Sequence, residues 1–250
     1  MISQSEIKLI RKLHTNKGRK LHSLVVIEGK RLFGQLVHYN IEFEKIWTTQ
    51  EFEINNKYFL KEIRSREKCK LISNIELKKI CLTKNPSGII GITKIPRLIT
   101  KKNTNQIIVL DDIADPGNLG TILRTACWFG IKNILLSKDC VDPYNPKVIR
   151  SAMGAHFNMN IISGQIEAQL QELKKDKFQI IAADVNARKS IKDFKLSKEK
   201  WALVMGSESK GLSKNVSKLV DEKIEITNND EIESLNVSVA CGIFLYHFSN

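Results

Sequence analysis

Short runs of apolar residues recur along the second half of the chain, with segments of helical periodicity between them. The runs are IIVL (107–110), NILL (133–136), FQIIAA (178–183), WALVM (201–205) and KIEI (223–226). Runs without polar alternation are typical of strands buried on both faces. Residues 118–129 also place their apolar side chains on one helical face. This alternation predicts an α/β fold, in which helices cover both sides of a parallel sheet.

The first hundred residues show a second and smaller pattern of the same kind. Its apolar runs are LVVIE (24–28), EKIWTT (44–49), KLIS (70–73) and GIIGI (88–92). The stretch that follows is rich in charge, Asn, Thr and Pro and lacks apolar periodicity, which is typical of a linker. We therefore expect a small α/β domain at 1–98, a linker at 99–106 and the larger domain at 107–250.

The positive charge of the chain is confined to its first part. The formal net charge is +13, from 40 Lys and Arg against 27 Asp and Glu. Residues 1–102 hold 22 basic and 9 acidic residues, whereas the rest holds 18 of each. A positive domain attracts a phosphate backbone and gains from counterion release, which favours RNA as the partner. The alternative is that the lysines only keep the chain soluble.

Other classes of protein are disfavoured by what the sequence lacks. There is no apolar run of eighteen residues, and the first twenty residues are too polar for a signal peptide. The five cysteines are scattered, with no C-x-x-C pair, so neither a disulfide framework nor a structural zinc site is expected. We expect a cytoplasmic protein without membrane contact or metal.

Open parallel sheets bind ligands beyond the carboxyl ends of their strands, so the loops there are the places to search. After the first run, Pro116 and Gly117 predict a tight turn and Asn118 a helix N-cap, with free N–H groups that form an anion site. Arg124 falls off the apolar face of that helix, within reach of a phosphate. A capped helix with one solvated arginine would explain this loop equally well.

Two further loops carry polar residues in the same position. After WALVM, Gly206 and Gly211 bracket a polar loop that contains Glu208, and glycine there permits close approach of the backbone to a flat ligand. An ordinary strand-to-helix turn would explain the loop as well, but not its glutamate. After KIEI, Ser234 and Asn236 stand at the start of a helix, where they would cap N–H groups or contact a ligand. His247 lies on that helix without Cys or His neighbours at metal spacing, and we assign it no role.

Taken together and in this order, the three loops resemble the motifs of a known family. The segments are D-x-x-x-DPGN-x-G-x-x-x-R-x-A (111–126), MGSE-x-x-GLS (205–213) and I-x-x-x-x-x-x-ESLNVSVA (226–240). They resemble the SpoU (TrmH-like) RNA ribose methyltransferases over residues 105–248. The first domain is similar to the substrate-binding domain of many members through Lys17, Arg19, VVIEG (25–29) and NPSGIIGI (85–92).

The resemblance implies transfer of a methyl group from S-adenosylmethionine to a ribose 2′-hydroxyl. It also implies a deep trefoil knot at the carboxyl end, a rare topology, and a homodimer formed through the knotted domain. By family analogy the substrate is ribosomal RNA in preference to transfer RNA. The family's cofactor contacts map onto Met205, Gly206, Ile226 and Leu235.

The family's catalytic positions correspond to Asn118, Arg124, Glu208, Ser234 and Asn236. Arg124 either accepts the hydroxyl proton or, as we prefer, grips the adjacent phosphate, because free guanidinium has a pKa of roughly 12.5–13.8. Asn118 and Asn236 are expected to position the ribose and hold the loops in register. Glu208 would orient Arg124 or a group of the partner subunit, and helix capping alone would explain Ser234.

One further segment, residues 142–159, resembles the stretch that follows the first motif in this family. Lys147, Arg150 and Ser151 would contact RNA phosphate there, and a solvated basic helix that begins at Pro146 is an equally good interpretation.

Three alternative functions remain open at this stage. The first alternative is a tRNA 2′-O-methyltransferase, and the second is a catalytically inactive RNA-binding factor in ribosome assembly. An unrelated enzyme that uses a nucleotide phosphate ranks last, because the pattern G-x-x-x-x-G-K-[ST] is absent.

Overall fold

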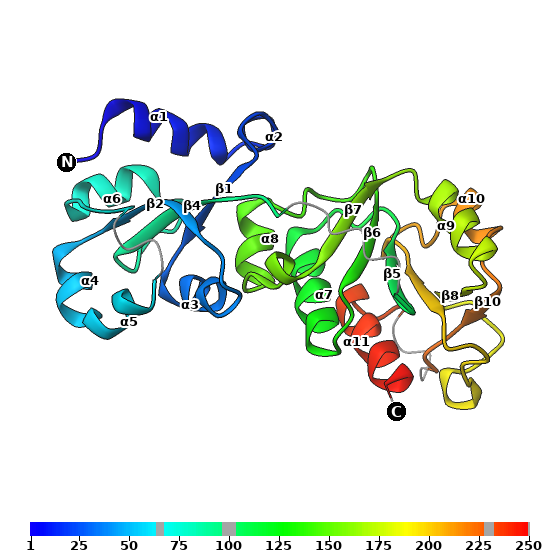
Figure 1. The fold of residues 1–250 in the computed structure, drawn as a ribbon. Helices are drawn as coiled ribbons and strands as arrows, with labels where there is room; N and C mark the ends of the chain where they lie inside the picture. The colour runs from blue at the N-terminus through cyan, green and yellow to red at the C-terminus, as the bar shows by residue number, and fades with distance from the viewer. Residues whose placement is uncertain (64–67, 97–103, 228–232, 250) are drawn as a thin grey trace. The chain divides into compact units, whose positions relative to one another are not determined.

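The structure is a computed structural model of the whole chain, and it describes residues 1–63, 68–96, 104–227 and 233–249. The chain divides into two compact units (Figure 1). The amino-terminal unit consists of residues 1–97 together with 144–157, and the carboxyl-terminal unit of residues 98–143 and 158–250. Residues 97–103, which include most of the predicted linker at 99–106, lie outside the described residues.

The carboxyl-terminal unit is a parallel sheet with helices on both faces, as the apolar runs predict. The sheet order is β10-β8-β9-β5-β6-β7, and every pairing is parallel. The strands are β5 (Gln106–Leu110), β6 (Asn133–Ser137), β7 (Asn160–Gly164), β8 (Gln179–Ala183), β9 (Trp201–Met205) and β10 (Glu222–Ile224). The helices are α7 (Pro116–Trp128), α9 (Ile166–Lys175), α10 (Lys214–Ser217) and α11 (Val237–Phe248), with a 3-10 turn at Ile191–Asp193.

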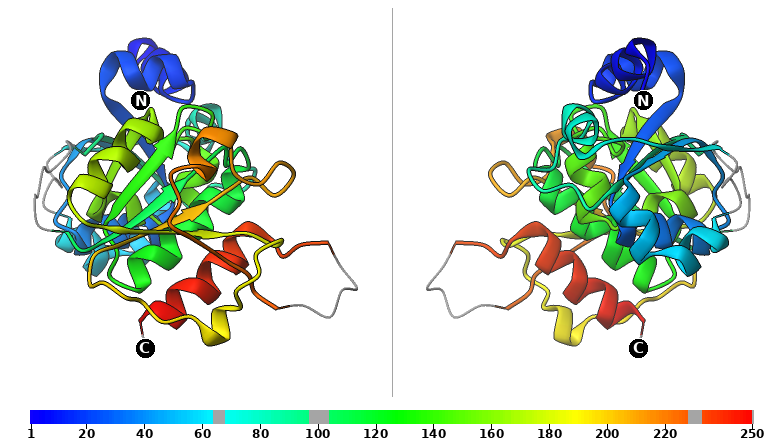
Figure 2. Two further views of the ribbon diagram at one scale, coloured as in Figure 1. Left: turned by 90° about the vertical axis from the view of Figure 1, so that its right-hand side faces the viewer. Right: turned by 90° about the vertical axis from the view of Figure 1, so that its left-hand side faces the viewer.

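The terminal helix α11 is held against segments that are distant in the sequence. It packs on α7, where a methyl group at Gly242 would lie 3.7 Å from Thr125 Cγ2. The ring of His247 forms a hydrogen bond of 2.8 Å with the Phe194 carbonyl, which places the loop after β8 beside α11 (Figure 2). The half-buried His247 therefore has a structural partner, in keeping with the absence of a predicted role.

The amino-terminal unit is built on a mixed sheet of order β1-β4-β2-β3, in which only the β2–β3 pair is parallel. Its strands are β1 (Leu24–Glu28), β2 (Phe43–Thr48), β3 (Cys69–Leu71) and β4 (Ile89–Lys94). Helices α1 (Gln4–Leu13), α2 (Asn16–His22), α3 (Lys30–His38), α4 (Gln50–Asn55), α5 (Lys57–Glu62) and α6 (Asn74–Ile80) surround it.

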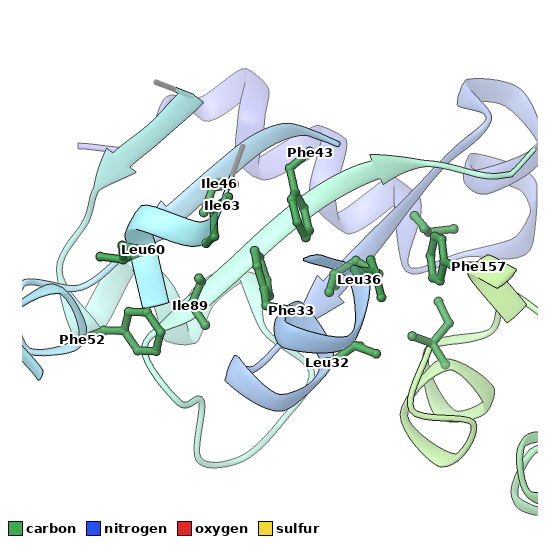
Figure 3. Packing of buried hydrophobic residues seen from close by; sticks show 13 residues of the cluster. Leu32, Phe33, Leu36, Phe43, Ile46, Phe52, Leu60, Ile63, Ile89 and Phe157 are labelled. Atoms are coloured by element: carbon green, nitrogen blue, oxygen red, sulfur yellow. The ribbon is translucent and has the colours of Figure 1, made fainter. Parts of the chain in front are cut away.

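Two apolar clusters hold the helices of this unit to opposite faces of the sheet. Ile10 and Leu13 of α1 pack with Trp47 in one cluster. In the other, Phe33 of α3 stacks on Phe43 at a ring distance of 4.4 Å (Figure 3). These fully buried aromatic residues contribute a large share of the stabilising apolar burial.

Residues 144–157 belong to the amino-terminal unit, whereas the sequence pattern assigned them to the domain at 107–250. The segment contains α8 (Pro146–Ser151) and leads into a 3-10 turn at Ala155–Asn158. Ile149 and Phe157 pack in the same cluster as Phe33 (Figure 3). His156 is fully buried, and desolvation lowers its pKa to about 3, so the ring is neutral and packs as an aromatic group. Apolar burial thus decides the unit to which this segment belongs.

Candidate active site

The three loops predicted from the sequence meet at the carboxyl edge of the larger sheet. Strands β5 and β9 are neighbours in register, with Leu110 beside Met205, and the Asp111 N–H donates to the Met205 carbonyl at 2.9 Å. The loops after β5 and β9 therefore start side by side at the carboxyl edge of the sheet. The loop after β10 returns to them through the start of α11, as the side-chain contacts below show.

The carboxylate of Glu208 joins all three loops. Its Oε1 accepts hydrogen bonds from Asn118 Nδ2 at 3.1 Å, from Asn236 Nδ2 at 2.9 Å and from the Val237 N–H at 3.0 Å. Asn236 Nδ2 also donates to Asn118 Oδ1 at 2.9 Å. Because an ionised carboxylate only accepts, it fixes the orientation of both amides. We call Asn118, Glu208 and Asn236 the amide–carboxylate cluster.

The helix starts differ from the sequence prediction in one respect. Asp115, and not Asn118, is the N-cap of α7, and its Oδ1 accepts from the Asn118 N–H at 2.8 Å. Pro116 takes the first helical position, where its missing N–H costs nothing. Asn118 therefore lies in the first turn, and its amide is left for the cluster.

The start of α11 also corrects the capping role considered for Ser234. The N-cap of this helix is Asn236, whose Oδ1 accepts from the Ser238 N–H at 3.0 Å and from the Ser238 hydroxyl at 2.6 Å. Ser234 is exposed and stands two residues before the cap. Ser234 is close in sequence to Asn236 of the cluster, and the role that stays predicted for it is contact with a ligand.

Two aspartates after β5 hold the loop that contains Glu208. Asp111, which is buried, accepts from the Ser213 N–H at 2.8 Å through its Oδ2. Asp112 pairs with Lys210 at 2.8 Å, and this hydrogen bond raises the pKa of the lysine. The sequence pattern predicts no role for Asp111, Asp112 or Lys210. The signal that would have found the aspartates is their position directly after a buried strand.

Backbone hydrogen bonds join the two ends of the loop after β9, and there is no space for a side chain at its first residue, Gly206. The Ser207 and Gly211 backbones exchange hydrogen bonds of 3.1 and 2.8 Å, and Gly211 adopts a left-handed φ of 64°. A Cβ at Gly206 would lie 2.5 Å from the Gly211 carbonyl carbon and oxygen. Glycine at 206 is therefore required by the close approach of two backbone segments.

Arg124 lies six residues beyond Asn118 on α7, about 9 Å along the helix axis at about 1.5 Å per residue. Its side chain is exposed, as the helical pattern predicts. No hydrogen bond or ion pair is found for its guanidinium within the described ranges of the chain, and Glu208 contacts the two asparagines instead. The guanidinium is thus available to an anionic ligand.

The predicted cofactor positions lie at the end of β9 and in two of the three loops, those after β9 and β10. Met205 is buried at the end of β9, Ile226 is half-buried after β10, and Leu235 is 38% exposed beside the cap of α11. Leu212, half-buried, follows Gly211 in the loop whose backbone approaches Gly206. Accessible apolar side chains next to backbone amides suit a flat heterocycle such as adenine.

The predicted RNA contacts have different surroundings. Lys17 is exposed, but Arg19 is only 3% exposed, and its Nη1 donates to the carbonyls of Leu13 and His14 at 3.0 Å each. A guanidinium committed to buried carbonyls supports the fold, so we do not retain Arg19 as an RNA contact. Lys147 is exposed, and Arg150 and Ser151 are half-buried, all three in the amino-terminal unit.

The described residues were also compared with what a metal site, a membrane span and a reactive cysteine require. Their His, Cys, Asp and Glu side chains do not gather in groups of three that would hold a metal ion. Within the same ranges, no helix combines the length and hydrophobicity that a bilayer crossing requires. Burial raises the pKa of the Cys81 and Cys241 thiols to about 12, so both are poor nucleophiles.

A parallel α/β sheet with three polar loops joined at its carboxyl edge is the usual place for a ligand site, and comparison with known proteins identifies the class of enzyme. Residues 105–246 match the model of the SpoU rRNA methylase family, and residues 4–91 match an MRM3-like substrate-binding domain. The chain belongs to the SpoU methylase family and is a methyltransferase, which confirms the resemblance seen in the motifs.

Relatives cover both units of the chain. The 23S rRNA (guanosine(2553)-2′-O)-methyltransferase RlmP of Bacillus subtilis is 27% identical, over 97% of this chain and 95% of that protein. A putative TrmH-family RNA methyltransferase of Porphyromonas gingivalis has a structure with a TM-score of 0.86 at 25% identity, covering 99% and 98% of the two chains. The AdoMet-bound rRNA methyltransferase of Sinorhizobium meliloti gives 0.84 at 23% identity, over 99% and 95%.

Proposed function

We propose that this protein transfers a methyl group from S-adenosylmethionine to a ribose 2′-hydroxyl of ribosomal RNA in the cytoplasm. The observation that carries the proposal is the amide–carboxylate cluster, in which one carboxylate oxygen joins the three loops. Family membership supports methyl transfer to RNA. The Bacillus subtilis relative, whose name gives a ribose oxygen of 23S rRNA as its target, supports the finer assignment.

The cofactor would be held by the loops that carry Gly206, Ile226 and Leu235, with Met205 beneath them. When bound, S-adenosylmethionine supplies an electrophilic methyl group on a sulfonium. The protein's task is to bring the ribose oxygen in line with that methyl group. Alignment of this kind lowers barriers by about 7–11 kcal/mol in favourable cases.

Arg124 is proposed to bind the phosphate beside the target ribose and to stabilise the negative charge that develops on the oxygen. Its planar fork matches a phosphate bidentately, and it is exposed on the helix that starts at the cluster. The guanidinium is already protonated at neutral pH and would not accept the 2′-hydroxyl proton. In this scheme the ribose oxygen takes the methyl group, S-adenosylhomocysteine is the leaving group, and the proton passes late in the step to solvent water. Asn118 and Asn236 keep the loops in register and border the space for the sugar.

We also propose that the protein acts as a homodimer through the carboxyl-terminal unit, in which the trefoil knot is expected. Support comes from exposed apolar side chains on the packed pair α7 and α11: Trp128 is 85% exposed, Val239 52% and Ile243 37%. Apolar surface gathered on two adjacent helices favours association. Light scattering should give twice the 28.5 kDa mass of one chain.

Arg124→Ala is expected to lower turnover at least tenfold, equivalent to about 1.4 kcal/mol, while affinity for S-adenosylmethionine is kept. The reason is that the guanidinium contacts the substrate phosphate and not the cofactor. Labelled methyl transfer to rRNA and calorimetric titration of the cofactor measure the two effects separately. Asn118→Ala should behave in the same way.

Arg124→Lys is the informative control, because lysine keeps the charge and loses the fork. Full activity of this variant would contradict the bidentate phosphate contact. Circular dichroism verifies the fold of Arg124→Ala, and loss of cofactor binding in the folded variant would contradict the assignment of Arg124 to the substrate phosphate.

A further inference from the structure

The second residue after β5 has a backbone conformation that no helix end explains. Asp112 has a φ of 58°, in the left-handed region that glycine adopts freely and that Asp and Asn tolerate better than most residues. In the described part of the chain, the other non-glycine residues with a positive φ stand at the carboxyl ends of helices, where a left-handed residue is common: Ser23, Asn40, Met153 and Lys177. Asp112 follows a strand, so its conformation needs another reason.

Two hydrogen bonds hold Asp112 in this conformation. Its N–H donates to Ser137 Oγ at 2.9 Å, and its Oδ2 accepts from Lys210 Nζ at 2.8 Å. Ser137 is the buried last residue of β6, and Lys210 lies in the loop after β9. Since β5 lies between β6 and β9 in the sheet, Asp112 connects the strand on one side of β5 with the loop on the other side. The left-handed residue therefore serves a contact between elements.

The ion pair between Asp112 and Lys210 is not needed to close the loop after β9. The Ser207 and Gly211 backbones already join the two ends of that loop. The side chain of Lys210 is 76% exposed and that of Asp112 is 29% exposed. An exposed ion pair contributes little to the stability of a fold. Its effect is therefore to be sought in the position of the loop.

The same loop carries residues that are expected to lie next to the cofactor. Gly206 begins it, and the half-buried Leu212 lies near its other end. Glu208 is held by three N–H groups from outside this loop and does not depend on Lys210. Loss of the ion pair would therefore loosen the part of the loop next to Leu212 and leave the amide–carboxylate cluster joined.

We propose that Asp112 and Lys210 are positioning residues that hold residues 206–213 against bound S-adenosylmethionine and slow its release. Neither residue touches the reacting atoms in this scheme. Opposite charges at 2.8 Å attract, and salt weakens the attraction between exposed groups by screening. The inference rests on the proposed function for the place of the cofactor in these loops.

The test uses the full-length protein and a matched ion pair elsewhere in the same unit. Lys210→Met and Asp112→Asn each remove one charge of the pair, and the double variant removes both. The control is Lys175→Met, which breaks the exposed Lys175–Glu172 pair on α9. Calorimetric titration with S-adenosylmethionine gives the affinity, and stopped-flow displacement gives the dissociation rate. Both are measured at low and at high salt, without RNA.

Lys210→Met and Asp112→Asn are each expected to weaken cofactor affinity about threefold to fivefold, through faster dissociation. Fivefold corresponds to about 1 kcal/mol, the upper end for an exposed ion pair. The double variant should be no weaker than either single variant, because the two charges act on each other. High salt should bring the wild type to the level of the variants. Lys175→Met should match the wild type throughout.

Asp112→Gly separates a positioning role from a structural one. Glycine adopts the left-handed conformation without strain, so the free energy of unfolding, measured by denaturant titration, should stay close to the wild-type value. Because the carboxylate is gone, cofactor affinity should fall as in Asp112→Asn. In turnover assays the loss should appear in the KM for the cofactor and not in kcat.

Additive losses in the double variant, an equal loss in Lys175→Met or full affinity in Asp112→Gly would overturn the inference. A fall in the stability of Asp112→Gly that accounts for its loss of affinity would overturn it as well. The proposed function fails separately. If the wild type binds S-adenosylmethionine with the help of this pair but transfers no methyl group to rRNA, the inference stands and the substrate assignment falls. If it methylates rRNA while Lys210→Met and Asp112→Asn bind the cofactor as the wild type does, the inference alone falls.

Discussion

Gly206→Ala is expected to weaken the binding of S-adenosylmethionine about 100-fold and to abolish measurable turnover. The added Cβ would lie 2.5 Å from the Gly211 carbonyl group and 2.8 Å from the Leu212 nitrogen, all backbone atoms. Backbone cannot move aside as a flexible side chain does, so the loop must open. Overpacking of this kind costs typically about 1–3 kcal/mol, and 2.7 kcal/mol corresponds to 100-fold. Calorimetric titration of the cofactor measures the loss.

The matched control is Gly164→Ala, at the end of β7. A Cβ there has Gln169 Nε2 at 3.8 Å as its nearest neighbour, which is ordinary contact. This variant should bind the cofactor as the wild type does. Cofactor affinity retained in Gly206→Ala would show that the loop from 206 to 211 does not form the cofactor site.

Glu208→Ala is expected to reduce kcat/KM by about 100-fold with little effect on the free energy of unfolding. The substitution removes the acceptor of three N–H groups, from Asn118, Asn236 and Val237. The Asn236–Asn118 hydrogen bond remains, but neither amide is then held by the loop after β9. Hydrogen bonds to a charged group contribute about 1.5–3 kcal/mol each, less where water replaces them, as it would around this exposed carboxylate. Steady-state kinetics and denaturant titration give the two quantities.

Glu208→Gln keeps one acceptor oxygen and should lose activity about tenfold, which lies between the wild type and the alanine variant. The control is Glu199→Ala, because Glu199 is also exposed, lies in the same unit and stands outside the cluster. A Glu208→Ala enzyme as active as Glu199→Ala would contradict the role given to the amide–carboxylate cluster.

Strands buried on both faces were predictable because they need uninterrupted apolar residues. The runs at 24–28 and 201–205 coincide with β1 and β9, and the other expected strands differ from the observed ones by at most two residues at either end. Strand β7 was missed because Asn160–Gly164 contains only two adjacent isoleucines. The position of residues 144–157 was also not predictable, since tertiary packing of Ile149 and Phe157 decides it.

The candidate site was predictable to the level of loops and not of contacts. Asn118, Glu208 and Asn236 were found because polar residues after buried strands must meet at one sheet edge. That a single oxygen of Glu208 serves three donors depends on side-chain geometry that spacing does not contain. Arg19 was predicted as an RNA contact and is buried instead. Its burial was not predictable, because its neighbours in the sequence are exposed basic residues.

The most direct test of the proposed 2′-O-methylation uses the purified protein, methyl-labelled S-adenosylmethionine and separate pools of unmodified rRNA and tRNA. The labelled nucleosides are then mapped. The proposal predicts label on a ribose 2′-oxygen of rRNA, incorporated at least tenfold more slowly by Arg124→Ala. Label on a base, on tRNA alone, or on neither pool would contradict it.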